Sequence, residues 1–548
     1  MSVAETLDRP VAGAARRDEP PAPPPSSVPL DAMGNPRPER RHLVGFFIMV
    51  VGMFMAILDI QIVASSLSEI QAGLGAAPDE IGWVQSSYLI AEVIIIPLSG
   101  WLSQVISTRW LFVISCAGFT LASFACAFAW SIESMIAFRV AQGFLGGAMI
   151  PTVFATSYFV LGRNNPRASI LMGLIATMGP TLGPTLGGWI TSALSWHWLF
   201  LLNIAPGLLV TIGTASLMDI DRPNLKLLRG FDLQGITAVA LFLGSMQYVL
   251  EEGAKNDWFQ SDEIITFTAL ATAGAVWFFW RAFTFERPVI DLRVFANRNF
   301  AIGCTIAFAI GFGMYGSVYI LPLFLGRVSG YDSFHIGTVL AVTGACQFLA
   351  TPISGLMARK LDPRIVLGIG LFAFSLGVYL NSFLTSESDF ADFVLPQAVR
   401  GFGIMLCMIP ANMLSLGALD PHEVKNGSGL YNLMRNTGGA FGLAIINTLL
   451  THRLDHHVAR LAEAVNPARL VATGRLEQMS SYFSTLAGGT IDGDKAALAI
   501  VRQMVTREAY VLAFTDVLLI MSVVFFSILV LVPLMRKLTA GGGAPADH

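Results

Sequence analysis

Six ionisable side chains fall inside long apolar segments, where charge is costly: Asp59, Glu92, Arg139, Arg400, Arg435 and Asp516. An isolated charge at the centre of a bilayer costs roughly 2.5–3.5 kcal/mol on insertion scales. Left unpaired, these charges would outweigh the net stability of a typical protein, so they must face a wet cavity or one another. A carboxyl group in such a place can take up and release a proton, whereas an arginine stays charged.

Asp59 and Arg139 are expected at a similar depth in the bilayer. Asp59 lies in the last third of the first apolar span, and Arg139 lies near the start of the fourth, which runs in the opposite direction. We therefore expect the two side chains to pair or to share a polar network, for which the donor fork of arginine is suited. Two roles stay open for Asp59: a static ion pair, or a carboxylate that exchanges protons under the influence of Arg139.

Glu92 lies in the middle of the second span, where no arginine of the first half reaches its depth. A buried carboxyl without a partner is suited to carry a proton, or it can attract a cationic substrate into a cavity. The alternative is an ordinary hydrogen-bonding role.

The second half has one intramembrane acid for two arginines. Asp516 in the last span is expected to pair with Arg435 or Arg400 in a structural contact. The remaining arginine is then available to a substrate or to an acid of the first half.

The elements that hold these charges are membrane-spanning helices. The chain is 54% hydrophobic and only 13% charged, and no strongly basic balance suggests nucleic-acid binding. Fourteen apolar spans of about 20 residues follow one another. Their expected limits are 43–66, 81–103, 110–130, 134–158, 168–192, 197–218, 233–251, 263–283, 299–326, 335–358, 364–384, 391–415, 427–450 and 509–535.

Charge in the loops predicts the orientation. Basic residues gather in the loops on one side, as in Arg163 and Arg167 or Arg359 and Lys360, whereas short loops on the other side, such as 66–80 and 385–390, contain none. By the positive-inside rule both termini are then cytoplasmic. The first apolar run begins too late and is too long for a cleaved signal peptide, so it is expected to act as an anchor.

The spans divide the chain into five parts, with a Pro-rich, disordered tail at residues 1–42 and a second tail at 536–548. Between the tails lie a six-helix half at 43–218, an inserted helix pair at 219–298 and a second six-helix half at 299–535. The second half includes an outer segment, 451–508, that begins with apolar residues at helical spacing. Its histidines, His452, His456 and His457, fit a solvated helix end better than a metal site.

An internal repeat supports the two halves. Pro97, Ser99, Gly100 and Arg109 recur at the same spacing as Pro352, Ser354, Gly355 and Arg364. The register continues upstream without a gap, and Arg139 to Gly143 has a looser echo around Arg400 and Gly401. An even number of inserted spans keeps the second half in the same topology, as a parallel repeat requires.

The fifth span contains a tandem motif, GPTLGPTLGG, at residues 179–188. Gly179, Gly183 and Gly187 repeat every four residues, so they form one bare stripe that lets another helix approach closely. Pro180 and Pro184 form a second stripe, and Gly188 closes the motif. In a membrane such prolines bend a helix without breaking it. The motif predicts either a kinked packing helix or a bent helix at a moving seam.

This pattern resembles the major facilitator superfamily, and within it the fourteen-span drug:proton antiporters of the EmrB/QacA type. Residues 58–63, LDIQIV, are similar to the family's signature in the first span, and residues 195–206 also resemble the family. Arg139, Gln142 and Gly143 match the fourth-span motif, and residues 179–188 match the antiporter motif of exporters. Gly100 to Arg109 matches the loop motif, without its usual Asp-Arg pair.

The resemblance implies an all-α membrane protein with the major facilitator fold, two six-helix halves and two inserted helices. It implies a proton-coupled exporter of lipophilic or amphipathic compounds in a bacterial inner membrane, working by alternating access and without a cofactor. Lipids and protons are expected partners, and exporters of this type in Gram-negative bacteria also work with a periplasmic adaptor and an outer-membrane channel.

Rival functions fit the sequence less well. No Gly-Lys dipeptide occurs, which excludes a P-loop for ATP, and no HxxxxD pair supports a membrane acyltransferase. A narrow-substrate exporter or a symporter on the same fold stays open as the alternative.

Overall fold

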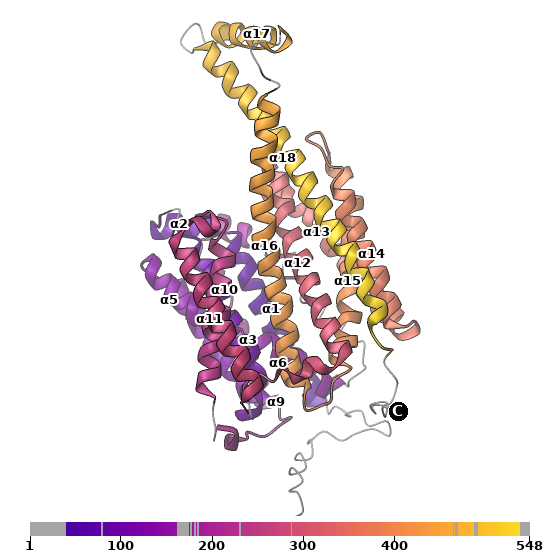
Figure 1. Ribbon diagram of the computed structural model, residues 1–548. Helices are drawn as coiled ribbons and strands as arrows, with labels where there is room; N and C mark the ends of the chain where they lie inside the picture. Colours follow the sequence, from indigo (N-terminus) through magenta and orange to yellow (C-terminus); the bar gives the residue numbers. More distant parts are fainter. Residues whose placement is uncertain are drawn as a thin grey trace, which may run out of the picture.

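The computed structural model describes residues 40–537 except 78–79, 162–174, 176–177, 180–181, 184–185, 229–231, 286–287, 332, 464, 466–469 and 487–491. The described residues form helices and connecting loops, and no strand occurs among them. Long helices run side by side as a bundle, and a smaller helical part projects from one end (Figure 1). The predicted tail at 1–42 lies almost entirely outside the described residues.

The first half contains the helices nearest the N-terminus. They are α1 (Arg40–Ala64), α2 (Leu67–Leu74), α3 (Trp83–Val105), α4 (Thr108–Ala127), α5 (Ile132–Gly146), α6 (Met149–Leu161), α8 (His197–Leu201) and α9 (Ile204–Leu217). The predicted span at 134–158 consists of α5 and α6, which meet at a short break after Gly146. Of the predicted span at 168–192, residues 175, 178–179, 182–183 and 186–192 are described and are helical.

The inserted pair forms a helical hairpin. It comprises η1 (Leu225–Leu228), α10 (Leu233–Glu252), η2 (Trp258–Gln260), α11 (Asp262–Thr284) and η3 (Leu292–Ala296). Helix α10 packs against α3 of the first half and also touches α16 of the second. Trp258 extends this second contact, because its Nε1 donates to Oγ1 of Thr448 at 2.9 Å. The hairpin therefore touches both halves.

The second half contains the longest helices. They are α12 (Arg298–Arg327), α13 (Ser333–Lys360), α14 (Pro363–Asn381), α15 (Phe390–Leu416), α16 (Val424–Ala462), α17 (Leu470–Leu486), α18 (Gly493–Ile528) and η4 (Leu529–Leu534). Twelve helices among the described residues are long and apolar enough to cross a membrane. Helix α16 is more polar than these, but it runs the length of the bundle beside α12 and α18 (Figure 1).

The same close helix contact occurs once within each half, as the sequence repeat predicts. A side chain at Gly143 would meet the carbonyl oxygen of Tyr88 at 2.3 Å, and one at Gly401 would meet that of Thr343 at 2.6 Å. Glycine is needed at both positions because a backbone carbonyl cannot move aside. Each half thus packs its fourth span against its second in the same way, and the predicted pair of six-helix halves with an inserted hairpin is confirmed.

The predicted outer segment is helical, but its boundaries differ from the expectation. Helix α16 continues without a break to Ala462, and α18 begins at Gly493, so neither helix ends where its apolar span does. Helix α17 packs against α18 at the far end of this projection (Figure 1).

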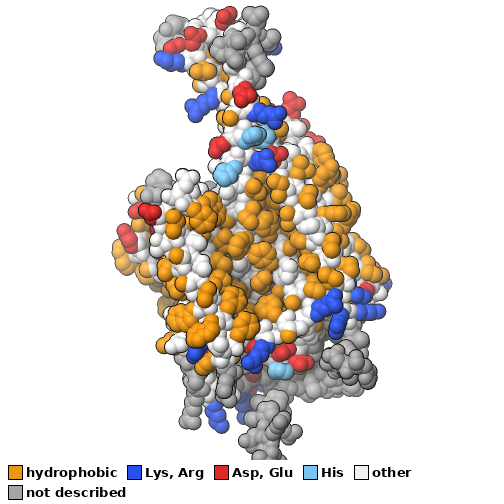
Figure 2. Space-filling view, viewed as in Figure 1, with side chains coloured by type: hydrophobic (Ala, Val, Ile, Leu, Met, Phe, Trp, Pro, Cys, Tyr) orange, Lys and Arg blue, Asp and Glu red, His pale blue; other side chains and the backbone are white. Residues whose placement is uncertain are grey.

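Basic residues mark the opposite end of the bundle. We call it the basic end, and it carries the charged residues Arg40, Arg109, Arg298, Lys360 and Arg536. Figure 2 shows a broad band of hydrophobic side chains across the visible face, with Lys and Arg side chains near its lower edge. This band is where the surrounding lipid would lie.

Candidate functional site

Asp59 is the centre of a buried polar network in the first half. Its Oδ2 lies 2.7 Å from Nη1 of Arg139, and both side chains are 0% exposed. Its Oδ1 accepts hydrogen bonds from Nδ2 of Asn203 at 2.7 Å and from Nε2 of Gln142 at 3.2 Å. The predicted contact between Asp59 and Arg139 is confirmed, and helices α1, α5 and α8–α9 together supply it.

Arg139 is held through its Nε and Nη1, whereas its buried Nη2 has no hydrogen-bond partner among the described residues. Its Nε donates to the backbone oxygen of Val84 at 3.0 Å, and its Nη1 also donates to Oε1 of Gln142 at 2.7 Å. Its guanidinium lies over the ring of Tyr88, 4.2 Å from the centroid, in cation–π geometry. Gly143 lies one helical turn after Arg139. Because it has no side chain, α5 can approach α3 closely enough for this packing. The fourth-span motif therefore builds an ion pair and the close contact around it.

Glu92 has a different environment. It lies in the middle of α3 and is 4% exposed, and it makes no hydrogen bond or ion pair with the residues that the structure describes. Helix α3 packs against α16 of the second half, and the carbonyl oxygen of Ile96, one turn after Glu92, lies against Gly429 of α16. Glu92 therefore faces the seam between the two halves.

Arg435 is the counterpart of Glu92 on the other side of the seam. Its Nη2 donates to Oδ1 of Asn432 at 2.8 Å, whereas its Nε and Nη1 have no partner among the described residues. The guanidinium lies 5.6 Å from the ring centroid of Phe154, which belongs to α6 of the first half. Arg435 thus faces the first half through Phe154, and its contact with an acid of that half stays a prediction.

Two tyrosines complete this region, one from each half. Tyr88 lies one turn before Glu92 on α3, and the ring of Tyr315 packs against Gly439, one turn after Arg435 on α16. The hydroxyl of Tyr88 is buried without a hydrogen-bond partner among the described residues. We call Tyr88, Glu92, Tyr315 and Arg435 the seam cluster. Neither tyrosine was predicted, because a single hydroxyl in an apolar span leaves no mark in the sequence.

The predicted pairing of Asp516 with Arg435 or Arg400 is wrong. Asp516 Oδ2 lies 2.8 Å from Nε2 of His457 and 3.7 Å from Nε of Arg453, and its side chain is 31% exposed. The apolar stretch that α18 and η4 form follows Asp516, at residues 517–534. Because α16 continues past its own apolar span, its histidine and arginine reach Asp516 near the end of the bundle that carries α17.

Arg400 has no acidic partner among the described residues. Its Nη2 donates to Oγ1 of Thr343 at 3.2 Å, and its Nη1 donates to the carbonyl oxygen of Ser317 at 3.3 Å. Arg400 precedes Gly401 and therefore occupies the repeat position of Gln142, whereas Gln397 stands where the first half has Arg139. The two halves are thus chemically unequal.

The glycine stripe of the fifth span packs against α1. Side chains at Gly179 and Gly183 would meet Ile57 and Gln61 of that helix, and one at Gly187 would meet Ser65 just after it, all at 2.3–2.4 Å. The predicted close approach of another helix is confirmed. Gly188 faces open space, and Pro180 and Pro184 lie outside the described residues.

The loop motif joins α3 to α4 at the basic end. A side chain at Gly100 would meet the backbone of Lys425 and Asn426 in α16 at 2.8 Å. Arg109 pairs with Asp219, its Nη1 lying 3.7 Å from Oδ1. The motif thus touches both the second half and the segment that leaves the first half.

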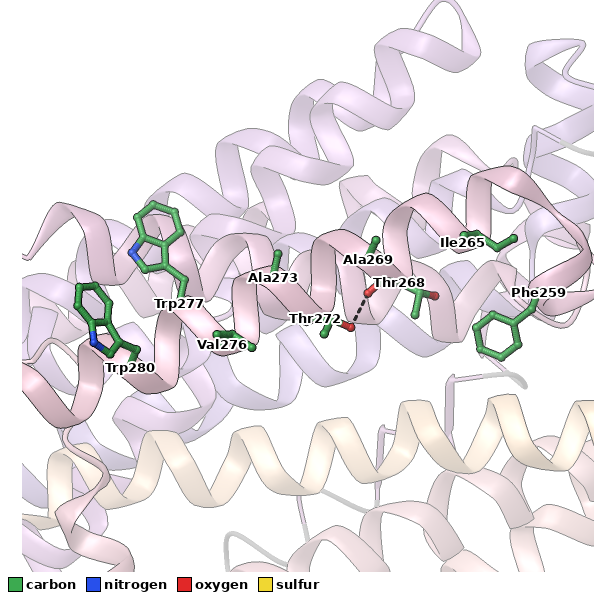
Figure 3. Close-up of a pocket in the computed structure, with 9 residues that line it drawn as sticks. All are labelled: Phe259, Ile265, Thr268, Ala269, Thr272, Ala273, Val276, Trp277 and Trp280. Carbon is green, nitrogen blue, oxygen red and sulfur yellow. Dashed lines mark hydrogen bonds between the residues drawn. The ribbon is translucent and has the colours of Figure 1, made fainter.

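A separate groove of about 780 Å³ runs along α11. Figure 3 shows its lining side chains along one helix, from Phe259 to Trp280, and none of them is charged. Val276 and Trp280 are mostly exposed, so this groove is part of the apolar outer surface rather than of the seam.

A bundle of two repeated halves, with buried charges facing across their seam, defines a secondary transporter. The chain belongs to the Major Facilitator Superfamily, which residues 49–443 match. It is 39% identical to the colistin resistance protein EmrB of Acinetobacter baumannii over 88% of this chain and 94% of that protein. It is 29% identical to the multidrug export protein EmrB of Escherichia coli, over 90% and 96%. The fatty acid resistance protein FarB of Neisseria gonorrhoeae is 28% identical, over 90% and 96%.

Solved structures agree on the fold. The proton:xylose symporter XylE matches 86% of this chain and 94% of its own, with a TM-score of 0.54 and 11% identity. The human organic anion transporter MFSD10 matches 85% and 100%, with a TM-score of 0.53 and 12% identity.

Proposed function

We propose that the protein is a proton-coupled exporter of lipophilic and amphipathic compounds that works by alternating access. Relatives that cover nearly the whole chain are named for multidrug export and for resistance to colistin or fatty acids. The two halves would rock about the seam cluster, exposing it to one side of the membrane at a time. An aromatic, largely apolar seam suits substrates that share little beyond size and lipophilicity.

The basic end would face the cytoplasm of a bacterial cell. Loops rich in Lys and Arg remain on the cytoplasmic side by the positive-inside rule, and both described ends of the chain lie there. The projection formed by α16, α17 and α18 then extends outward. Tyr482, Leu498 and Met504 are exposed on it, before the apolar stretch that follows Asp516, which favours contact with a periplasmic adaptor.

The observation that carries the coupling is the buried, unbonded Glu92 opposite Arg435. Protonating Asp59 would leave Arg139 as an unpaired buried charge, which is strongly unfavourable. Protonating Glu92 breaks no bond to a described residue. We therefore assign the proton that is exchanged to Glu92, and a supporting role to Asp59 and Arg139.

The sign of this charge favours cationic substrates. A positively charged group and a proton neutralise the same carboxylate, so each one lowers the affinity for the other, and this competition is antiport. When neither a proton nor a cationic substrate is bound to Glu92, the guanidinium of Arg435 would balance the charge of the carboxylate. A negatively charged compound at Arg435 would instead bind best with Glu92 protonated, which is symport. The Nε and Nη1 of Arg435, which have no partner among the described residues, make this the second candidate.

The test is the binding of two probe ions, tetraphenylphosphonium and tetraphenylborate, to the purified protein as a function of pH. We expect the cation to bind more tightly as the pH rises. Glu92→Gln should remove this pH dependence and weaken binding about 10- to 100-fold, the value of a charge-assisted contact. Glu69→Gln, the same change on an exposed helix, should behave like the wild type.

Transport in inverted vesicles completes the test. The wild type and Glu69→Gln should release protons from an acidified lumen when the cation is added, and Glu92→Gln should not. If Glu92→Gln binds with an unchanged pH dependence, the assignment is wrong. Tighter binding of the anion at low pH, lost in Arg435→Gln, would replace antiport by symport.

A further inference from the structure

The described contacts between the two halves concentrate at the basic end. Gly100 of α3 lies against the backbone of α16, and Oγ of Ser428 donates to the carbonyl oxygen of Pro151 at 3.2 Å. The hydroxyl of Tyr158 donates to Oδ1 of Asn412 at 2.9 Å. Helices α3 and α6 thereby close against α15 and α16, and the seam is shut on this side.

One ion pair crosses this closed seam. Nζ of Lys425 lies 2.5 Å from Oδ2 of Asp221, and the side chains are 14% and 22% exposed. Lys425 is the second residue of α16, in the second half, and Asp221 follows α9, in the segment that leaves the first. The ammonium also lies 5.7 Å from the ring centroid of Phe159 in α6. Partial burial makes such a pair stronger than a fully exposed one.

Asp221 is held firmly on the first half. Both its oxygens accept from the backbone N–H of Thr108, at 3.0 and 3.1 Å, and Oδ2 also accepts from the Thr108 hydroxyl at 2.7 Å. Thr108 begins α4, so the carboxylate also satisfies a free N–H at a helix N-terminus. The loop that carries Gly100 and Arg109 has no acid between them. Its link to the second half runs instead through an acid from another segment.

We propose that Asp221 and Lys425 form a latch that holds the basic end closed, and that the latch must break for the transporter to open on that side. Opening would separate α16 from α3 and α6 and leave both charges in water. The ion pair exists only in the form that is closed at the basic end. It therefore shifts the equilibrium between the closed and the open form toward the closed one. The latch does not depend on which compound the protein carries.

The test measures access to a thiol buried in the closed seam. Ser428→Cys places the thiol beside Pro151, where it is buried in this form. Full-length protein in inverted vesicles is treated with a charged maleimide, without substrate or proton gradient. Labelling of the same variants without the introduced cysteine is subtracted. We expect Lys425→Met and Asp221→Asn each to speed labelling about tenfold.

Three further variants make the result specific. Asp219→Asn removes a charge from the same segment, and the ion pair of Asp219 with Arg109 stays within the first half, so this variant should label like the parent. The double variant Asp221→Asn with Lys425→Met should label no faster than either single change, and the exchange Asp221→Lys with Lys425→Asp should slow labelling again. Equal labelling in all variants, or an equal increase in Asp219→Asn, would overturn the latch. The probe-ion experiment tests Glu92 separately, so either proposal can fail alone.

Discussion

Replacing Arg139 by alanine is the sharpest test of the buried network. The change leaves Asp59 fully buried with its charge unpaired, although Asn203 and Gln142 still donate to it. Breaking a buried ion pair from one side costs about 3–5 kcal/mol. The lost contact with the ring of Tyr88 adds up to about 2 kcal/mol. We expect a loss of about 3–5 kcal/mol in the free energy of unfolding, because the two remaining donors offset part of the sum.

The same loss should shrink when the partner charge is removed as well. In Arg139→Ala with Asp59→Asn no buried charge is left, so the double variant should be more stable than Arg139→Ala alone. Arg327→Ala is the matched control, because Arg327 is exposed and, among the described residues, contacts the hydroxyl and the ring of Tyr510. It should lose no more than about 1 kcal/mol.

The assay is denaturant unfolding of the detergent-solubilised variants, followed by tryptophan fluorescence and checked for reversibility. An Arg139→Ala protein as stable as Arg327→Ala would refute the reasoning. So would a double variant whose loss equals the sum of the two single losses, because the charges would then be independent.

Two further outcomes follow from packing and capping. Gly311→Ala should lower the free energy of unfolding by about 1–3 kcal/mol, because its new methyl group would lie 1.9 Å from the carbonyl oxygen of Arg435. In the control, Gly326→Ala, the nearest neighbour of the methyl group lies at 3.9 Å, so this variant should melt like the parent. Equal melting temperatures of the two variants would contradict this reasoning. Asp362 caps α14, and hydrogen bonds from Arg364 hold the pKa of its carboxyl below the usual value. Asp362→Ala should therefore lose about 1 kcal/mol at neutral pH. A lowered pKa means that this difference is full above about pH 4 and fades as the pH falls through the folded-state value, which melting curves at several pH values can check; a difference that grows in acid would be inconsistent with this contact.

Depth along a span was enough to predict contacts within one half. Asp59 and Arg139 meet because both lie near the same end of antiparallel helices, and the glycine stripe at 179–187 packs closely because bare positions recur every four residues. Hydrophobicity and helical spacing determine both features, so the sequence contains them.

Contacts between the halves could not be predicted in the same way. The position of Arg435 against Phe154 depends on how the second half docks against the first, which no local pattern encodes. Asp221 lies in a loop, where neither depth nor periodicity constrains a side chain. The misplacement of Asp516 has another cause: hydropathy marks where lipid contact ends, but a helix can continue into water, and α16 does so.

That continuation has a mechanical consequence. At 1.5 Å per residue the 39 residues of α16 measure about 58 Å, well beyond the thickness of a bilayer. The helix continues unbroken from Arg435 in the seam cluster to its last residue, Ala462, and α18 runs beside it. Helices α16 and α18 therefore form a rigid arm that moves as one with the part of the second half inside the membrane. Any tilt of the second half during transport displaces α17 more than the residues inside the membrane. A protein bound at α17 would therefore be displaced in each transport cycle.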